Sequence, residues 1–125
     1  MKKIICFILV FAFLLLFTAC NQTKSNIEVF SFSYSEHAEI YKDDNPGVKH
    51  DGFKNINESK ISNAEDALER AKKECTVTWD SFGVSFDNES NVWMVCFYID
   101  GEILGGDQTV YLDSNGKTLL IVYGE

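Results

Sequence analysis

The second half of the chain alternates apolar and polar side chains with a period of two, which predicts β-strands. Phe82, Val84 and Phe86 share one face of residues 81–86, and residues 92–99 are apolar on both faces, as expected of a central strand. Further strands are predicted at residues 109–112 and 118–123, joined by a hairpin turn at residues 114–116 (Ser-Asn-Gly). Four predicted strands therefore follow one another at the end of the chain.

One amphipathic helix is predicted before these strands, at about residues 63–75. Ser62 and Glu65 have the spacing of a capping box, in which each side chain bonds a free backbone amide at the start of the helix. The apolar side chains behind this box recur at helical spacing: Ala64, Ala67, Leu68, Ala71 and Cys75. Three of the five are alanines, so we expect the helix to lie close to the surface on which it packs.

The region before this helix has a weaker pattern. Residues 27–34 alternate loosely, with Phe30, Phe32 and Tyr34 on one side, and are interpreted as a half-buried strand. Residues 42–59 contain several Asp, Asn and Gly residues and few apolar ones, which predicts a long surface connection. Phe53 is the side chain of this connection that we expect to insert into the core.

The longest apolar run of the chain, residues 4–17, follows two lysines and precedes Thr18, Ala19 and Cys20. A positive start, an apolar stretch of this length and small residues at its end are typical of an export signal. The alternative is a membrane helix that is retained. This run is shorter than the roughly 20 residues that cross a bilayer, which favours the export signal.

The end of this run, residues 17–20 (Phe-Thr-Ala-Cys), resembles the box of a bacterial lipoprotein signal, with Phe where that box usually has Leu. The resemblance implies that Cys20 carries a diacylglyceryl group, with acyl chains such as palmitate, and begins the mature protein after cleavage. It also implies a protein anchored by lipid to the extracytoplasmic face of the cell membrane. The predicted organisation is a signal peptide at 1–19, the lipidated cysteine and a polar tether at 20–26, and a single domain at 27–125. Residues 27–60 of this domain hold the first strand and the long loop, and residues 61–125 hold the helix and the meander.

The predicted elements have the order β-α-β-β-β-β. This order indicates an α+β fold in which one amphipathic helix packs on an antiparallel meander sheet of four to five strands. The helix entry at Ala64, the strand at 92–97, the turn at Gly105 and Gly106 and the segment 110–117 resemble small exported PepSY-like domains. Cystatin-like and nuclear-transport-factor-like folds share this pattern of strand, turn and strand. The resemblance implies a scaffold and leaves the function to its surface.

The charge of the predicted mature chain is strongly negative. Lys2 and Lys3 would leave with the signal, so 11 basic side chains fall to 9 while all 19 acidic ones remain, for a net charge of −10. Such a surface excludes nucleic acid as an expected partner, because phosphates are bound through Lys and Arg. It also disfavours attraction to anionic lipid by charge. The membrane is therefore expected to hold the protein through the lipidated N-terminus alone.

Two cysteines, Cys75 and Cys96, remain once Cys6 is removed and Cys20 is acylated. Outside the cytoplasm they would either form a disulfide or stay as buried apolar thiols, and the sequence leaves both alternatives open. The chain has no Cys-x-x-Cys, so neither a thioredoxin-like redox site nor a zinc knuckle is predicted.

Candidate catalytic chemistry is sparse. His37 and His50 are the only histidines, and neither stands in the spacing of a zinc motif, so we expect both to be solvated. A serine nucleophile in Gly-x-Ser-x-Gly is also missing. The acidic runs at 43–45 and 87–89 carry oxygen ligands that calcium favours, although Asp and Asn in turns explain them more simply. We therefore expect no enzyme, no catalytic residue, no cofactor and no metal site.

Aromatic side chains supply the remaining candidate for function. Trp79, Tyr98, Tyr111 and Tyr123 lie beside acidic or glycine turns, and exposure on one sheet face would make them an interaction surface. The predicted function is thus non-catalytic binding of a protein partner outside the cytoplasm. The PepSY-like resemblance would imply modulation of an envelope peptidase or another envelope protein. The alternative is an immunity protein of nuclear-transport-factor-like fold that neutralises a toxin by covering its active site with an acidic face.

Overall fold

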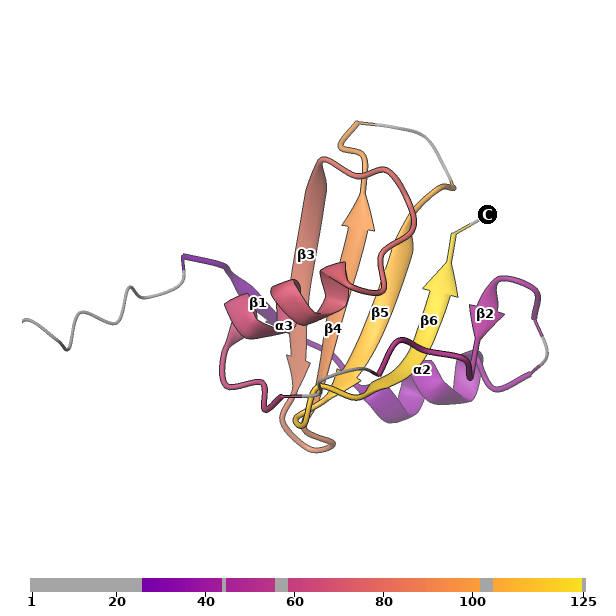
Figure 1. Cartoon of the computed structure of the whole chain (residues 1–125). Coiled ribbons are helices and arrows are strands. Elements are labelled where there is room, and N and C mark those ends of the chain that lie inside the picture. Colours follow the sequence, from indigo (N-terminus) through magenta and orange to yellow (C-terminus); the bar gives the residue numbers. More distant parts are fainter. Residues whose placement is uncertain (1–25, 44, 56–58, 102–104, 125) are drawn as a thin grey trace, which may run out of the picture.

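In the computed structural model of the protein, residues 26–43, 45–55, 59–101 and 105–124 are described, and two helices flank a sheet of six strands (Figure 1). The predicted signal peptide, Cys20 and most of the tether lie outside these residues. The elements in chain order are β1 (Val29–Ser31), α2 (Tyr34–Ile40), β2 (Val48–Lys49), α3 (Ala64–Lys72), β3 (Ser81–Asp87), β4 (Val92–Tyr98), β5 (Gln108–Asp113) and β6 (Thr118–Tyr123). The strands lie in the order β1-β3-β4-β5-β6-β2.

The centre of the sheet is the antiparallel meander β3-β4-β5-β6, which confirms the four strands expected from the period of two. Their register aligns Val84, Val95, Val110 and Ile121 in one row across the sheet, and none of these side chains is more than 1% exposed. The predicted hairpin turn is also present, with Gly116 in the left-handed region at a φ of 79°. Periodicity alone therefore located the core of the fold.

Helix α3 covers the face of the sheet that carries this row (Figure 1). Ala67 and Ala71 are completely buried, so small side chains let the helix backbone come close to the strands, as the sequence predicted. Phe53 packs against the same core from the preceding loop, which confirms its predicted insertion. None of the helices in the described parts of the chain is long and apolar enough to span a membrane.

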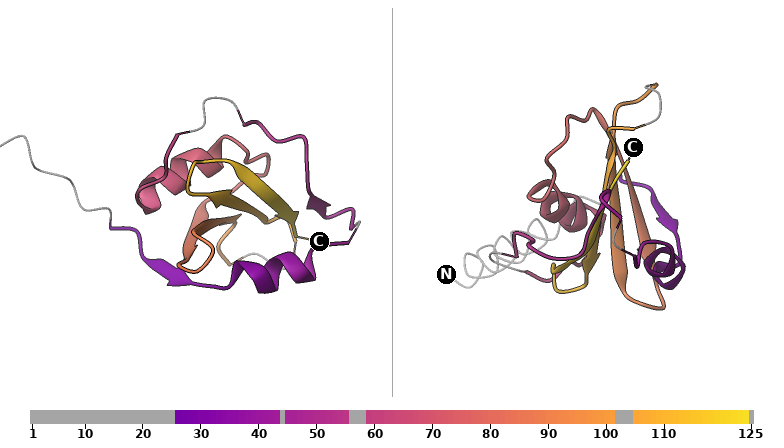
Figure 2. Two further views of the ribbon diagram at one scale, coloured as in Figure 1. Left: turned by 90° about the horizontal axis from the view of Figure 1, so that it is seen from below. Right: turned by 90° about the vertical axis from the view of Figure 1, so that its right-hand side faces the viewer.

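The opposite face of the sheet is covered only in part (Figure 2). Helix α2 lies over the end of the sheet near the β3–β4 turn, where Val92, Tyr111 and Leu120 form a second, smaller core. The backbone N–H of Tyr34, the first residue of α2, donates to Asp87 Oδ2 at 2.8 Å, which fixes the start of the helix to the end of β3. No residue of α2 is itself fully buried.

The strand predicted for residues 27–34 is wrong in its second half. β1 ends at Ser31, and α2 begins at Tyr34 after an extended N-cap residue, Ser33. Tertiary packing overrides the local alternation here, because helical spacing places Tyr34 and His37 on one side of α2, above Tyr111. The sequence did contain a signal for this helix, since Ser33 and Glu36 have capping-box spacing.

The start of α3 is displaced by one residue from the predicted capping box. Asn63, rather than Ser62, is the N-cap, and its Oδ1 accepts the Asp66 N–H at 2.9 Å. Asp66 Oδ2 in turn accepts the Ser62 N–H at 3.0 Å, so the side chain at N3 bonds the amide before the N-cap rather than that of the N-cap itself. Asn is as good an N-cap as Ser, and the sequence offered both in succession.

The sheet is mixed and has six strands, whereas an antiparallel sheet of four to five strands was predicted. β1 pairs with β3 in parallel, because the chain between them makes a long crossover that includes α3. The predicted surface connection also contains β2, a two-residue strand that pairs with β6. β1 and β2 are the two edges of the sheet.

A buried polar network holds α3 to the loops at its side. Arg70 is 4% exposed, and its Nε donates to the Gly116 carbonyl at 2.7 Å. Glu74, 3% exposed, lies 3.6 Å from the Arg70 guanidinium and accepts the Lys54 N–H at 2.7 Å. The pair therefore joins the helix, the loop after β2 and the β5–β6 hairpin, and the helical pattern of apolar residues gave no sign of it.

Candidate binding surface

Helix α2 leaves one half of the second sheet face uncovered in the described structure (Figure 2). We call it the open half-face and define it by Gly83, Cys96, Tyr98 and Thr109, which the register of β3, β4 and β5 places side by side. Tyr98 is 37% exposed, and a Cβ added at Gly83 would meet nothing within 4 Å. Figure 2 shows this end of the sheet free of either helix on the side of α2. A flat surface with an exposed aromatic ring results.

Two acidic residues, Asp80 and Asp100, lie at the end of β4 beside Tyr98. The Asp80 N–H donates to the Tyr98 carbonyl at 3.2 Å, and Asp80 Oδ1 accepts the Asp100 N–H at 2.9 Å. The Asp100 N–H and the Ser81 hydroxyl, which both donate to it, lower the pKa of the Asp80 carboxyl. Asp80 is thus ionised at neutral pH and gives this end of the surface a fixed negative charge.

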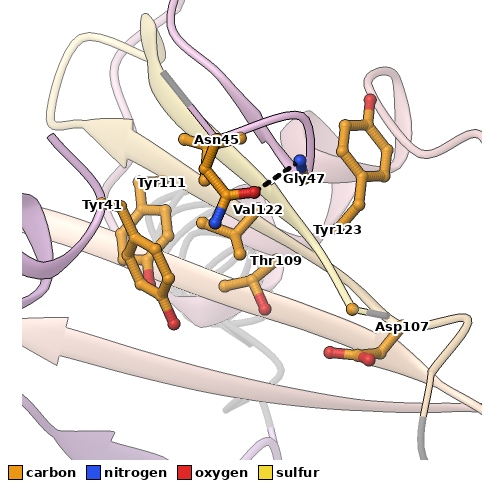
Figure 3. Close-up of a pocket in the computed structure, with 10 residues that line it drawn as sticks. Tyr41, Asn45, Gly47, Asp107, Thr109, Tyr111, Val122 and Tyr123 are labelled. Carbon is orange, nitrogen blue, oxygen red and sulfur yellow. Dashed lines mark hydrogen bonds between the residues drawn. The ribbon is translucent and has the colours of Figure 1, made fainter. Parts of the chain in front are cut away.

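A pocket of about 260 Å³ lies between the C-terminal end of α2 and the open half-face (Figure 3). Thr109 and Val122 form its floor, and Tyr41 and Asp107 lie on opposite sides of this floor in Figure 3. Asn45 stands at its rim, and its Oδ1 accepts the Gly47 N–H at 2.9 Å. Phe97 and Gln108 are the last paired residues of β4 and β5 at this end. Tyr98 follows Phe97 and Asp107 precedes Gln108, so the pocket adjoins the acidic end of the surface.

The four aromatic residues predicted as an interaction surface do not form one surface, although Tyr111 and Tyr123 both line the pocket of Figure 3. Only Tyr98 is on the open half-face. Tyr111 is 2% exposed beneath α2, and Tyr123 packs on the core under α3. Trp79 also packs on that core, with its ring centroid 5.1 Å from that of Phe97. The prediction rested on the number of aromatic residues near turns. The face on which each side chain lies depends instead on its position in its own strand.

His37 has a partner that the sequence did not suggest. Its Nδ1 lies 2.7 Å from the Tyr111 hydroxyl oxygen, and its ring contacts the rings of Phe32 and Tyr41. Burial raises the pKa of the Tyr111 phenol, which keeps this hydroxyl protonated. His37 is therefore part of the second core rather than a solvated side chain, while His50 is exposed as expected. Neither makes a hydrogen bond to a carboxylate in the described contacts.

Cys75 and Cys96 are free and lie on opposite sides of the sheet. Cys75 packs against the core under α3, and Cys96 alternates with Val95 and so faces the open half-face. Both are half-buried. Of the two alternatives that the sequence left open, the structure has free thiols, and burial raises the pKa of the Cys96 thiol.

The acidic turns have ordinary structural roles where they are described. Asp87 accepts backbone N–H groups from Tyr34, Glu89 and Ser90, and these bonds hold the β3–β4 turn and α2 together. Asp43 accepts the Asn45 N–H through its carbonyl oxygen at 2.7 Å. Within the described ranges no group of three or more His, Cys, Asp or Glu side chains is placed to hold a metal ion.

Of the residues that line the pocket, Tyr111 and Tyr123 were predicted as interaction residues, whereas Tyr41, Asp107, Thr109 and Val122 were not. The register of β5 and β6 pairs Thr109 with Val122 on the face opposite the main core, and the sequence pattern assigned neither residue to a face. Nothing in the sequence indicated that Tyr41, at the end of an unpredicted helix, would come beside them.

Comparisons with known proteins give no match: no family model, no curated protein and no solved structure is similar to this chain.

Proposed function

We propose that the chain is a lipid-anchored, extracytoplasmic, non-catalytic protein that binds a protein partner through the open half-face. The observation that carries the proposal is the exposed Tyr98 residue on an otherwise uncovered half of the sheet face, with the acidic residues Asp80, Asp100 and Asp107 at the same end of the strands. Exposed aromatic rings are enriched in protein interfaces and supply much of their binding energy. The acidic border would favour a partner with a basic surface.

Membrane anchoring through Cys20 belongs to the same proposal and rests on the sequence. Val29, the first residue of the sheet, is nine positions after Cys20. At about 3.3–3.6 Å per residue this segment spans at most roughly 30 Å. The open half-face would therefore work close to the membrane surface, where envelope proteins are the available partners.

Two identities for the partner remain in the proposal. A PepSY-like role would make it a peptidase or another envelope protein whose activity is modulated. An immunity role would make it a toxin whose basic active site is covered, and the acidic pocket beside the open half-face favours this second candidate. Both act by the same surface, so one experiment addresses both.

The test is site-specific photo-cross-linking in cells. A photoreactive phenylalanine analogue would replace Tyr98 in the anchored protein, and a matched control would carry it at Glu65, an exposed position on α3. We expect one partner to be trapped from position 98 and not from position 65, and to be lost with Cys20→Ala. Equal trapping at the two positions, or no trapping at position 98, would overturn the proposal. A trapped peptidase or toxin would decide between the two roles.

A further inference from the structure

We propose that the pocket between Tyr41 and Asp107 binds an arginine side chain of the partner, an inference that rests on the proposed binding function. The volume of the pocket is about 260 Å³. Sites for drug-sized ligands and cofactors typically measure about 300–1,000 Å³, and one water molecule takes about 30 Å³ in the liquid. The size of the pocket thus fits a single long side chain better than a cofactor or a solvent molecule.

The charge of the pocket selects a cation. Asp107 is the one acidic or basic residue among those that line the pocket. None of the described lysines or arginines forms a salt bridge with it, so this carboxylate lacks a counter-ion within the described structure. A bound anion would be repelled, whereas a cation would gain a charge-assisted hydrogen bond.

The shape of the pocket favours arginine over lysine. In Figure 3 the Tyr41 ring and the Asp107 carboxylate stand on opposite sides of the floor made by Thr109 and Val122. A guanidinium group is flat, stacks on aromatic rings and bonds a carboxylate with two parallel N–H groups. Its methylene stem would lie over Val122, as long cationic side chains commonly do on apolar surface.

The Asp107 carboxylate lies against the backbone of Gly124. The Gly124 N–H donates to the Asp107 carbonyl oxygen at 2.9 Å. A methyl group added at Gly124 would overlap Asp107 Oδ1, so the carboxylate lies directly against this glycine. Asp107 is the only carboxylate among the residues that line the pocket, which makes it the main acceptor for a cation.

The experiment titrates the full anchored protein, purified in mild detergent, with Nα-acetyl-arginine amide and follows the backbone amides by NMR. Nα-acetyl-citrulline amide, which has nearly the same shape without the charge, is the control ligand. We expect the arginine compound to shift the amides of Asp107, Thr109 and Val122 with a dissociation constant roughly in the millimolar range, since a single side chain makes few contacts. Citrulline should leave them unchanged.

Three variants test whether the Asp107 carboxylate is the group that binds arginine. Asp107→Asn keeps the shape of the side chain and should weaken arginine binding about tenfold or more, the loss expected for one charged hydrogen bond. Gly124→Ala keeps the charge but displaces the carboxylate, and it should weaken binding too. Glu65→Gln, at an exposed acid on α3 outside the pocket, should have no effect. Unchanged dispersion of the amide spectrum shows that each variant is folded.

Citrulline binding as strong as arginine binding, or an Asp107→Asn variant that binds arginine normally, would overturn the inference. So would the absence of any shift at the pocket amides. If position 98 still traps a partner in cells under that outcome, the proposed binding function stands and only the arginine site fails.

Discussion

The Nδ1 atom of His37 lies 2.7 Å from the hydroxyl oxygen of Tyr111, and this bond joins α2 to the centre of the sheet. The centroids of the two rings are 5.8 Å apart, and the ring planes are nearly perpendicular, at 73°. Because α2 has no fully buried residue of its own, this contact and the bond from Tyr34 to Asp87 carry much of its attachment.

Replacing either partner of this bond should destabilise the fold. We expect Tyr111→Phe and His37→Phe each to lower the free energy of unfolding by about 1–2 kcal/mol, because a part-buried polar group loses its partner. The double variant should lose less than the sum, with a coupling of roughly 0.5 kcal/mol or more. Urea unfolding of the four proteins measures this coupling, and strictly additive losses would contradict the proposed role of the bond.

The Tyr111 phenol should also make the protein sensitive to alkali. Burial raises its pKa in the folded state, so folding favours the protonated form. Its contribution to stability is complete below the unfolded pKa, about 10, and is lost as the pH rises through the folded pKa. Unfolding free energies at pH 8 and above pH 10 should therefore differ more for the natural protein than for Tyr111→Phe. An equal difference would show that Tyr111 does not titrate with unfolding.

Asp87 should make the protein sensitive to acid. The Tyr34 N–H is the main cause of its lowered pKa, and the Glu89 and Ser90 N–H groups add to it. A carboxyl with a lowered folded pKa stabilises above its unfolded pKa, about 3.9, and that stability is lost as the pH falls through the folded pKa. Asp87→Asn should reduce the loss of stability between pH 6 and pH 3, whereas Glu65→Gln, an exposed control on α3, should not. An unchanged loss in Asp87→Asn would refute the assignment.

The buried pair Arg70 and Glu74 should be far more sensitive to substitution than an exposed pair on the same helix. Arg70→Met leaves Glu74 without its cation in a buried setting and should cost about 3–5 kcal/mol. Lys72, whose Nζ lies 2.6 Å from Glu69 Oε1 at the surface, is the matched control, and Lys72→Met should cost at most about 1 kcal/mol. Thermal or urea unfolding compares the two, and similar losses would contradict the importance of burial.

Cys75 and Cys96 should remain unpaired without any reductant, because the sheet separates their side chains. Intact mass under non-reducing conditions should show two free thiols in the domain. Cys96 should react slowly with iodoacetamide near neutral pH, since its raised pKa leaves little thiolate. A mass lower by two hydrogens, with a peptide linking positions 75 and 96, would contradict the described arrangement.

The sequence by itself determined the meander, helix α3 and the alternation that separates the two faces of the sheet. These features depend on local periodicity: Phe82, Val84 and Phe86 must share a face of a strand, and Ala67 and Ala71 must share a face of a helix. The export signal with Cys20 also depends on local order along the chain, and it stays a prediction.

Only the tertiary structure decided which side chains come together from distant parts of the chain. The loose alternation of residues 27–34 predicted a strand, yet contacts of Tyr34 and His37 with Tyr111 favour a helix there. The same packing places Tyr41 and Asp107 on opposite sides of Thr109 in the pocket. It also separates the predicted aromatic residues: Tyr98 is exposed, Tyr111 lies under α2, and Trp79 and Tyr123 pack on the core under α3. The periodicity of a sequence shows which side chains share a face of one helix or strand. A site needs side chains from several elements, and strand register and chain crossovers decide which of these faces meet.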